Sequence, residues 1–161
     1  MTIQATKQRK QMLERRLAEL HKELAKEGEN LGSARGDDHE PTGNVQLLDV
    51  AERVGFITGR IQEIEEILND MVEVEPVYHC VGIGSKVTLS LMRGDEIFDT
   101  IVAVIDGVAD NKGPLPVCSP CSPMIEAILG ATTEEDPRRF TTPMGDIFDI
   151  KVECIEPAYD Y

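Results

Sequence analysis

Basic residues are scarce in this sequence. Its 161 residues include 16 Lys and Arg against 30 Asp and Glu, so the formal net charge is -14. A protein that holds nucleic acid by itself usually carries charge of the opposite sign. The charge balance therefore argues against stable nucleic-acid binding by this chain alone. If the protein works beside nucleic acid, we expect another molecule to hold that nucleic acid.

Long apolar runs and tryptophan are also missing. The sequence has no run of the roughly 18 apolar residues that a membrane span requires, and no charged-then-apolar signal segment at its start. We therefore expect a cytoplasmic protein without a membrane partner, whose four cysteines stay reduced. The absence of Trp and an aromatic content of 4% predict a modest core rather than a large enzyme pocket.

The N-terminal half shows two apolar patterns with helical spacing, which predict an antiparallel helical hairpin over residues 1–75 with its tip at 32–45. Neither helix could bury its apolar stripe alone, so each is expected to form the core of the other. The doubled step of three in the second series predicts a local change of supercoil. Two glycines beside it, Gly55 and Gly59, predict a close approach by the first helix. The first series is Leu13, Leu17, Leu20, Leu24 and Leu31, with Glu27 in the missing slot, and the second is Leu47, Ala51, Val54, Ile57, Ile61, Ile64, Leu68 and Met71.

Residues 76–161 change to the alternation of β-strands, which predicts an α+β protein with an antiparallel sheet in its second domain. One short helix is expected to begin at Ser122, with Pro123 at its first position, and to stop at Gly130. The side chains expected to face the core are Val87, Leu89, Leu91, Phe148, Ile150, Val152 and Cys154.

Four segments, in order along the chain, resemble the Gre-type transcription factors (GreA/GreB-like). GFITGRIQEIEEIL at 55–68 is similar to the family's second coiled-coil helix, and VGIGSKVTL at 81–89 to the first strand of its C-terminal domain. SPMIEAILG at 122–130 and TPMG at 142–145 resemble the segments S-P-[IL]-x-x-A-[IL]-[IL]-G and T-P-x-G. The resemblance covers nearly the whole chain.

This resemblance implies a bacterial protein that binds RNA polymerase and is not itself an enzyme. The FKBP-like C-terminal domain would dock at the rim of the polymerase's secondary channel, with Ser122 and Pro123 in the contact. The hairpin, as a monomer, would enter the channel. Its tip acids Asp37, Asp38 and Glu40 would come near the active centre and its Mg²⁺. No cofactor or metal intrinsic to this chain is implied.

The tip is where this sequence departs from the family, whose cleavage-competent tip reads roughly D-x-x-E-N-A-x-Y. Counting back from Gly55, the first acid falls on Glu40, but the second falls on Gly43. Asn44 matches the Asn. Leu47 replaces the Tyr, and Pro41 biases Glu40 away from helix. The departure favours a factor that occupies the channel and inhibits, rather than one that stimulates cleavage.

Alternative functions stay open on the sequence alone. Asp37 and Asp38 could replace the missing carboxylate, which would make the chain a true transcript cleavage factor. The hairpin could instead be a plain interaction module, in which case exposed apolar residues such as Val50 and Phe56 would form the contact. The pair in CSPC at 118–121 could be half of a zinc or redox site, but a structural zinc site needs four ligands, so free thiols are the better expectation.

Overall fold

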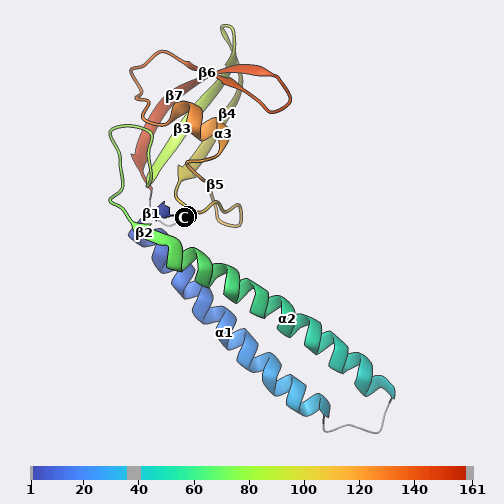
Figure 1. The fold of residues 1–161 in the computed structure, drawn as a ribbon. Helices are drawn as coiled ribbons and strands as arrows, with labels where there is room; N and C mark the ends of the chain where they lie inside the picture. The colour runs from blue at the N-terminus through green and yellow to red at the C-terminus, as the bar shows by residue number, and fades with distance from the viewer. Residues whose placement is uncertain (1, 36–40, 159–161) are drawn as a thin grey trace. The chain divides into compact units, whose positions relative to one another are not determined.

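Two long helices account for most of the N-terminal half of the chain (Figure 1). The structure is a computed structural model, and it describes residues 2–35 and 41–158. The chain divides into two units, one formed by Lys10–Asp70 and the other by Met1–Arg9 together with Met71–Tyr161. None of the described helices combines the length and the apolar character needed to cross a membrane.

The helical unit is the predicted hairpin. Helix α1 (Lys7–Arg35) and helix α2 (Pro41–Asp70) have 29 and 30 residues, so each is about 45 Å long at 1.5 Å per residue. The turn therefore falls between Arg35 and Pro41, inside the predicted range. The tip acids Asp37, Asp38 and Glu40 lie outside the described residues. The core of the hairpin contains buried Leu20, Ile57, Ile61 and Ile64, with Leu13, Leu17, Leu24 and Leu68 packed against them.

The seam of α2 differs from the predicted series at one point. Val50 is 5% exposed, whereas Ala51 is exposed, so Val50 and not Ala51 occupies the seam. With Val50 in place, the seam positions run in steps of three and four without interruption. The predicted change of supercoil is therefore wrong, because apolar character alone misassigned two adjacent residues. The corrected seam is Leu47, Val50, Val54, Ile57, Ile61, Ile64 and Leu68.

The two glycines of α2 do not serve a close approach of α1. A Cβ atom added at Gly55 or at Gly59 would meet nothing within 4 Å. That prediction is wrong, because both glycines lie away from the seam. Since glycine in a helix interior is about 1 kcal/mol less favourable than alanine, both positions lower the stability of α2 without a packing reason within the described chain.

The second unit is built on a five-stranded sheet with the order β5-β4-β3-β7-β6. Its strands are β3 (Ser85–Arg93), β4 (Glu96–Ile105), β5 (Val117–Cys118), β6 (Arg138–Thr141) and β7 (Ile147–Pro157). The α+β class is confirmed. The sheet is mixed and not purely antiparallel, because β5 runs parallel to β4 while the other pairs are antiparallel.

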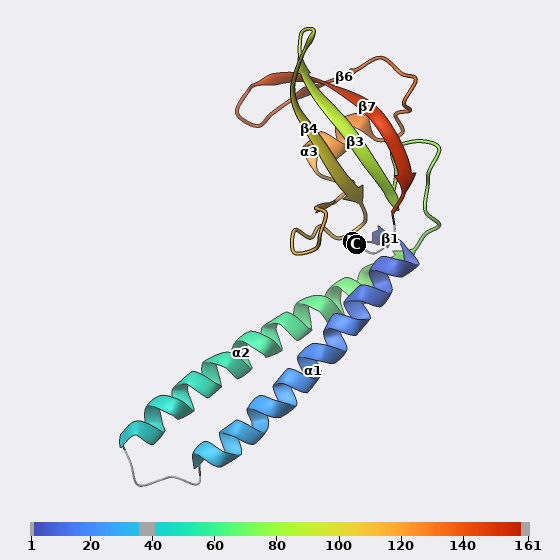
Figure 2. The same cartoon turned by 180° about the vertical axis from the view of Figure 1, so that it is seen from behind.

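The sheet curls around the short helix α3 (Pro123–Ile128), as Figure 2 shows from behind. The core between them contains the predicted inward residues Val87, Leu89, Ile150 and Val152 together with Ile125 and Ile128 of the helix. Cys154 was predicted to face this core but is exposed. A β-bulge explains the difference: Thr88 pairs with Cys154 but Leu89 pairs with Val152, so the alternation shifts by one residue.

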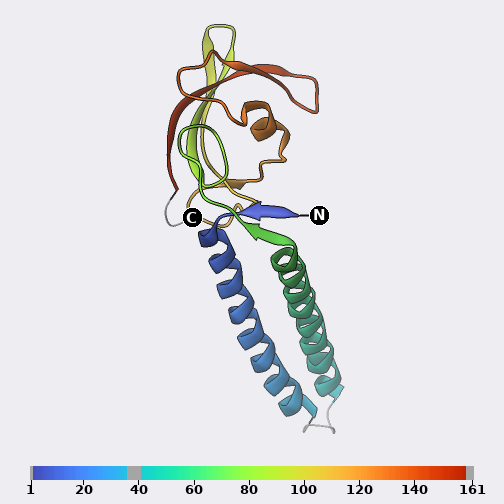
Figure 3. The same ribbon diagram turned by 60° about the vertical axis from the view of Figure 1, so that its left-hand side comes forward.

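A second, two-stranded sheet was not predicted. Strand β1 (Ile3–Ala5) pairs in parallel with β2 (Met71–Glu73), so the start of the chain lies beside the segment that follows α2 (Figure 3). The register pairs Ile3 with Met71 and Ala5 with Glu73. Met71, predicted as the last seam residue of the second helix, is instead the first residue of β2. Strands of three residues carry too little pattern to be identified from sequence.

Candidate functional site

The junction between the two helices is the first place where the sequence predicts function. Helix α2 begins at Pro41, directly after Glu40, and proline is favoured at the first helical position. Gly43, which stands where the resemblance in sequence would place a second acid, therefore lies in the first turn of α2. A helical pair of carboxylates three residues apart cannot form from Glu40 and Gly43. The sequence between the helix ends still supplies three carboxyl groups, on Asp37, Asp38 and Glu40.

The loop before α3 is the second predicted site. Ser122 has extended backbone angles (φ -68°, ψ 139°) and precedes the helix as predicted, but its side chain makes no capping hydrogen bond. Its backbone is fixed nonetheless, because its N–H donates to the Ser119 carbonyl at 3.0 Å and its carbonyl accepts from Glu126 N–H at 2.8 Å. Pro123 is exposed beside it. The loop is thus held in one conformation by backbone bonds, with the proline ring facing solvent.

The CxxC pair consists of Cys118, the last residue of β5, and Cys121 in this loop. All four cysteines of the chain are free thiols. Burial raises the pKa of the Cys118 thiol, so this group stays protonated and unreactive to a higher pH than an ordinary cysteine. Among the described residues, no group of three or more His, Cys, Asp or Glu side chains is arranged to hold a metal ion.

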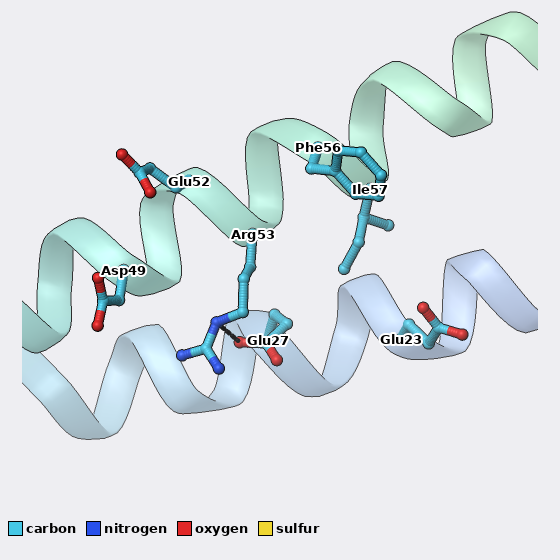
Figure 4. A pocket seen from close by; sticks show the side chains of 7 residues that line it. All are labelled: Glu23, Glu27, Asp49, Glu52, Arg53, Phe56 and Ile57. Carbon is cyan, nitrogen blue, oxygen red and sulfur yellow. Dashed lines mark ion pairs between the residues drawn. The ribbon is translucent and has the colours of Figure 1, made fainter.

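An open groove follows one side of the helical hairpin, and the sequence did not predict it (Figure 4). It has a volume of about 690 Å³. Arg53 of α2 reaches across to Glu27 of α1, with 3.8 Å between the charged groups. Glu27 occupies the missing slot of the first seam, so an ion pair replaces an apolar contact at this level. The lining residues are Glu23, Glu27, Asp49, Glu52, Arg53, Phe56 and Ile57.

Two large apolar side chains of α2 are exposed, and one of them, Phe56, lines this groove. Phe56 is 72% exposed, as predicted for a residue outside the seam, while Val50 is buried and cannot form a contact. Leu48, two turns before Phe56 on the same helix, is 65% exposed. The exposure of Leu48 was not predicted, because Leu48 stands next to the seam residue Leu47 and either leucine could have faced the core.

The sequence also missed a polar network inside the β-sheet unit. Asp106, which is fully buried, accepts hydrogen bonds from the Thr6 N–H at 3.0 Å and the Thr6 hydroxyl at 2.6 Å. Arg9, 3% exposed, lies 3.5 Å from the carboxylate of Asp110. The two partners in each pair are about a hundred residues apart in sequence, so no local pattern could have indicated them. The network ties the first residues of the chain to the end of β4.

Comparisons with known proteins give similarity in structure only. No family model and no curated protein matches the sequence. Among solved structures, GreA factor homolog 1 (Gfh1) of Thermus thermophilus is 23% identical, with 97% of this chain and 99% of that chain covered and a TM-score of 0.44. The Gfh1 of Thermus aquaticus is also 23% identical, covers 96% and 98%, and has a TM-score of 0.45. The transcription elongation factor GreA/GreB from Nitrosomonas europaea is 15% identical, covers 96% and 98%, and has a TM-score of 0.35.

Proposed function

We propose that this chain is a Gre-like factor that binds RNA polymerase at its secondary channel and inhibits transcription. The observation that carries the proposal is the order of four family-like segments along a chain whose first half is a hairpin of two long helices. Helices of about 45 Å are long enough to carry the residues between Arg35 and Pro41 far into a channel. In this proposal the polymerase is the enzyme, and the chain changes its activity without a metal or cofactor of its own.

The two units have separate tasks in the proposed function. The loop at Ser122 and Pro123 docks on the polymerase, since its backbone is held by hydrogen bonds before any partner arrives. A preformed loop loses little conformational freedom on binding. The hairpin then occupies the channel. Any Mg²⁺ near Asp37, Asp38 and Glu40 would belong to the active site of the polymerase.

Inhibition is favoured over cleavage because the second family acid is replaced by Gly43. A carboxylate there would supply oxygen ligands for a second metal ion and help to position the attacking water. Without that carboxylate, an inserted hairpin blocks access to the active centre but does not help to cleave the RNA. The specific observation in favour of the other function, transcript cleavage, is the presence of Asp37 and Asp38 just before Glu40.

The test uses purified RNA polymerase elongation complexes stalled in a backtracked state with Mg²⁺. The full chain is added and RNA length is followed, with and without nucleotides. We expect unshortened RNA, slower extension and protection from an added cleavage factor. Shortened RNA that can be extended again would overturn inhibition and make Asp37, Asp38 and Glu40 the cleavage ligands.

A matched variant separates docking from the effect at the tip. Replacing Asp37, Asp38 and Glu40 together by alanine should leave the affinity for polymerase largely unchanged, since docking is assigned to the other unit. Its effect on extension should change if the acids act at the active centre. If the wild-type chain does not bind polymerase at all, the proposed function is wrong.

A further inference from the structure

The side of α2 that faces away from the hairpin seam carries two exposed apolar side chains, two glycines and one acid over three turns in its N-terminal half. At about 3.6 residues per turn, this side is opposite Val54, Ile57 and Ile61. Phe56 and Leu48 are the large exposed side chains on it, at 72% and 65% exposure. We call this surface the outer α2 face, and it consists of Leu48, Glu52, Gly55, Phe56 and Gly59.

The glycines of the outer α2 face point to a partner outside the chain. The space beside Gly55 and Gly59 is empty to at least 4 Å, so nothing in the described chain uses the missing Cβ atoms. Glycine weakens a helix, and these two flank the most exposed phenylalanine of the molecule. A physical use for two glycines one turn apart is to let another backbone come close to the helix surface. The exposed ring of Phe56 between them would then be covered by the same partner.

The charges of the groove beside this face indicate what that partner carries. Four carboxylates line the groove, on Glu23, Glu27, Asp49 and Glu52, against the single guanidinium of Arg53, so the lining carries a formal charge of -3. Glu27 pairs with Arg53 and Glu23 with Arg16, which leaves Asp49 and Glu52 as the carboxylates that a basic partner would meet. Phe56 and Glu52, both labelled in Figure 4, belong to the groove lining and to the outer α2 face, so the groove and this face adjoin along α2.

Such a surface repels phosphate groups and attracts lysine and arginine. Nucleic acid is therefore a poor occupant, and a basic protein segment is a good one. An α-helix fits the geometry best, because helices whose contact residues are small approach at the short end of the 8–10 Å range of axis separations. An apolar side chain of that helix would cover Phe56, and its basic side chains would reach Asp49 and Glu52.

We propose that the outer α2 face docks a basic α-helix of RNA polymerase while the hairpin is inserted. This inference rests on the proposed function and adds to it a second contact, formed by the shaft of the hairpin rather than by its tip or by the loop at Ser122. The contact holds the inserted hairpin in place. This contact would explain Gly55 and Gly59, which have no packing role within the described chain, by a function in binding.

The test measures the affinity of the full chain for core RNA polymerase together with the melting temperature of each variant. In the double variant Gly55→Ala/Gly59→Ala, we expect a higher melting temperature and an affinity about tenfold lower, because two added methyl groups stiffen the helix but hold the partner away. Gly28→Ala is the matched control, since Gly28 lies in α1 with nothing within 4 Å of an added Cβ. It should raise the melting temperature and leave the affinity unchanged.

Two further variants test the apolar and the charged part separately. Phe56→Ala should lower the affinity about tenfold, as for a truncated aromatic anchor. Asp49→Asn/Glu52→Gln should lower it too and should make it less sensitive to salt, because fewer charges are then screened. Asp49, Glu52, Gly55 and Phe56 are exposed, and a Cβ added at Gly59 meets no atom within 4 Å, so the variants should fold as the wild type does.

Each outcome decides between the two proposals. If the wild type binds polymerase and the glycine and Phe56 variants bind equally well, the outer α2 face has no part in docking, while the proposed function stands. If the wild type does not bind polymerase, the proposed function fails and this inference fails with it. Self-association in sedimentation experiments that Phe56→Ala abolishes would identify a second copy as the occupant and would overturn the docking of a polymerase helix.

Discussion

The buried side chain of Asp106 fixes the start of the chain to the β-sheet unit, and its removal should be severely destabilising. Both of its oxygens accept hydrogen bonds, from the Thr6 N–H at 3.0 Å, the Thr6 hydroxyl at 2.6 Å and the Gly107 N–H at 2.7 Å. A hydrogen bond to a charged group contributes about 1.5–3 kcal/mol, and these contributions are not additive. Asp106→Ala takes the acceptor away from these buried donors, and each buried donor left unsatisfied costs about 1–3 kcal/mol. We therefore expect Asp106→Ala to lower the free energy of unfolding of this unit by about 3–5 kcal/mol.

In Asp106→Ala, the start of the chain should open locally before the whole unit unfolds. Thr6 also accepts a hydrogen bond from the Arg9 N–H at 3.2 Å, which caps the first turn of α1. Without Asp106, strand β1 and this first turn lose their attachment to the end of β4. Amide hydrogen exchange should therefore accelerate most at Thr6 and Gly107, ahead of the central strands.

The assay combines urea unfolding, followed by circular dichroism, with amide exchange read residue by residue. Glu134→Ala is the control, because Glu134 is an exposed acid of the same unit. A surface change of this kind should stay within about 0.5 kcal/mol. A double-mutant cycle with Thr6→Val should give a coupling energy of about 0.5–3 kcal/mol, since the two side chains share one network. Equal unfolding midpoints for Asp106→Ala and Glu134→Ala would refute the reasoning.

Three other predictions follow from the corrected geometry. In the hairpin, Val50→Asp should lower the melting temperature strongly, because it puts a carboxylate into the seam, whereas Ala51→Asp should change the melting temperature little. The opposite order would support the predicted seam, in which Ala51 faces α1. Gly107→Ala should lower the free energy of unfolding of the β-sheet unit by about 1–3 kcal/mol, because an added Cβ would collide with the Gln4 carbonyl. At Gly130 an added Cβ meets no atom, so Gly130→Ala should lower the free energy of unfolding by only about 1–2 kcal/mol, through its positive φ. Unfolding in urea measures both variants. Alkylation of Cys118 by iodoacetamide should begin at a higher pH in the folded chain than in urea, because burial raises its pKa, and identical pH profiles by mass spectrometry would contradict this.

Much of the fold could be read from the sequence because its signals are local and periodic. The leucine and isoleucine spacing indicated two helices. The alternation in residues 86–92 and 146–157 indicated strands, and most of their predicted inward residues form the core. Ser122, Pro123 and Gly130 marked the ends of α3. Each of these signals depends on residues within one or two turns of each other, where the period of the element decides which side chains face inward.

The sequence failed where two adjacent residues could exchange places or where the partner was remote. Val50 and Ala51 are both apolar, and only the packing of α2 on α1 decided which one entered the seam. Cys154 left the core because of a bulge in the pairing of β3 with β7. Strand β1 and the Thr6–Asp106 bonds depend on contacts across about a hundred residues, which no local period encodes.

The candidate sites divide in the same way. The sequence by itself determined the carboxylates at 37, 38 and 40, the glycine at 43 and the family-like segments, because these are matters of residue identity and order. Only the tertiary structure decided that Gly55, Gly59 and Phe56 face away from the seam and that a groove with a formal charge of -3 lies beside them. The physical reason is that a helix has more than one side, and which side is free depends on where its partner helix packs.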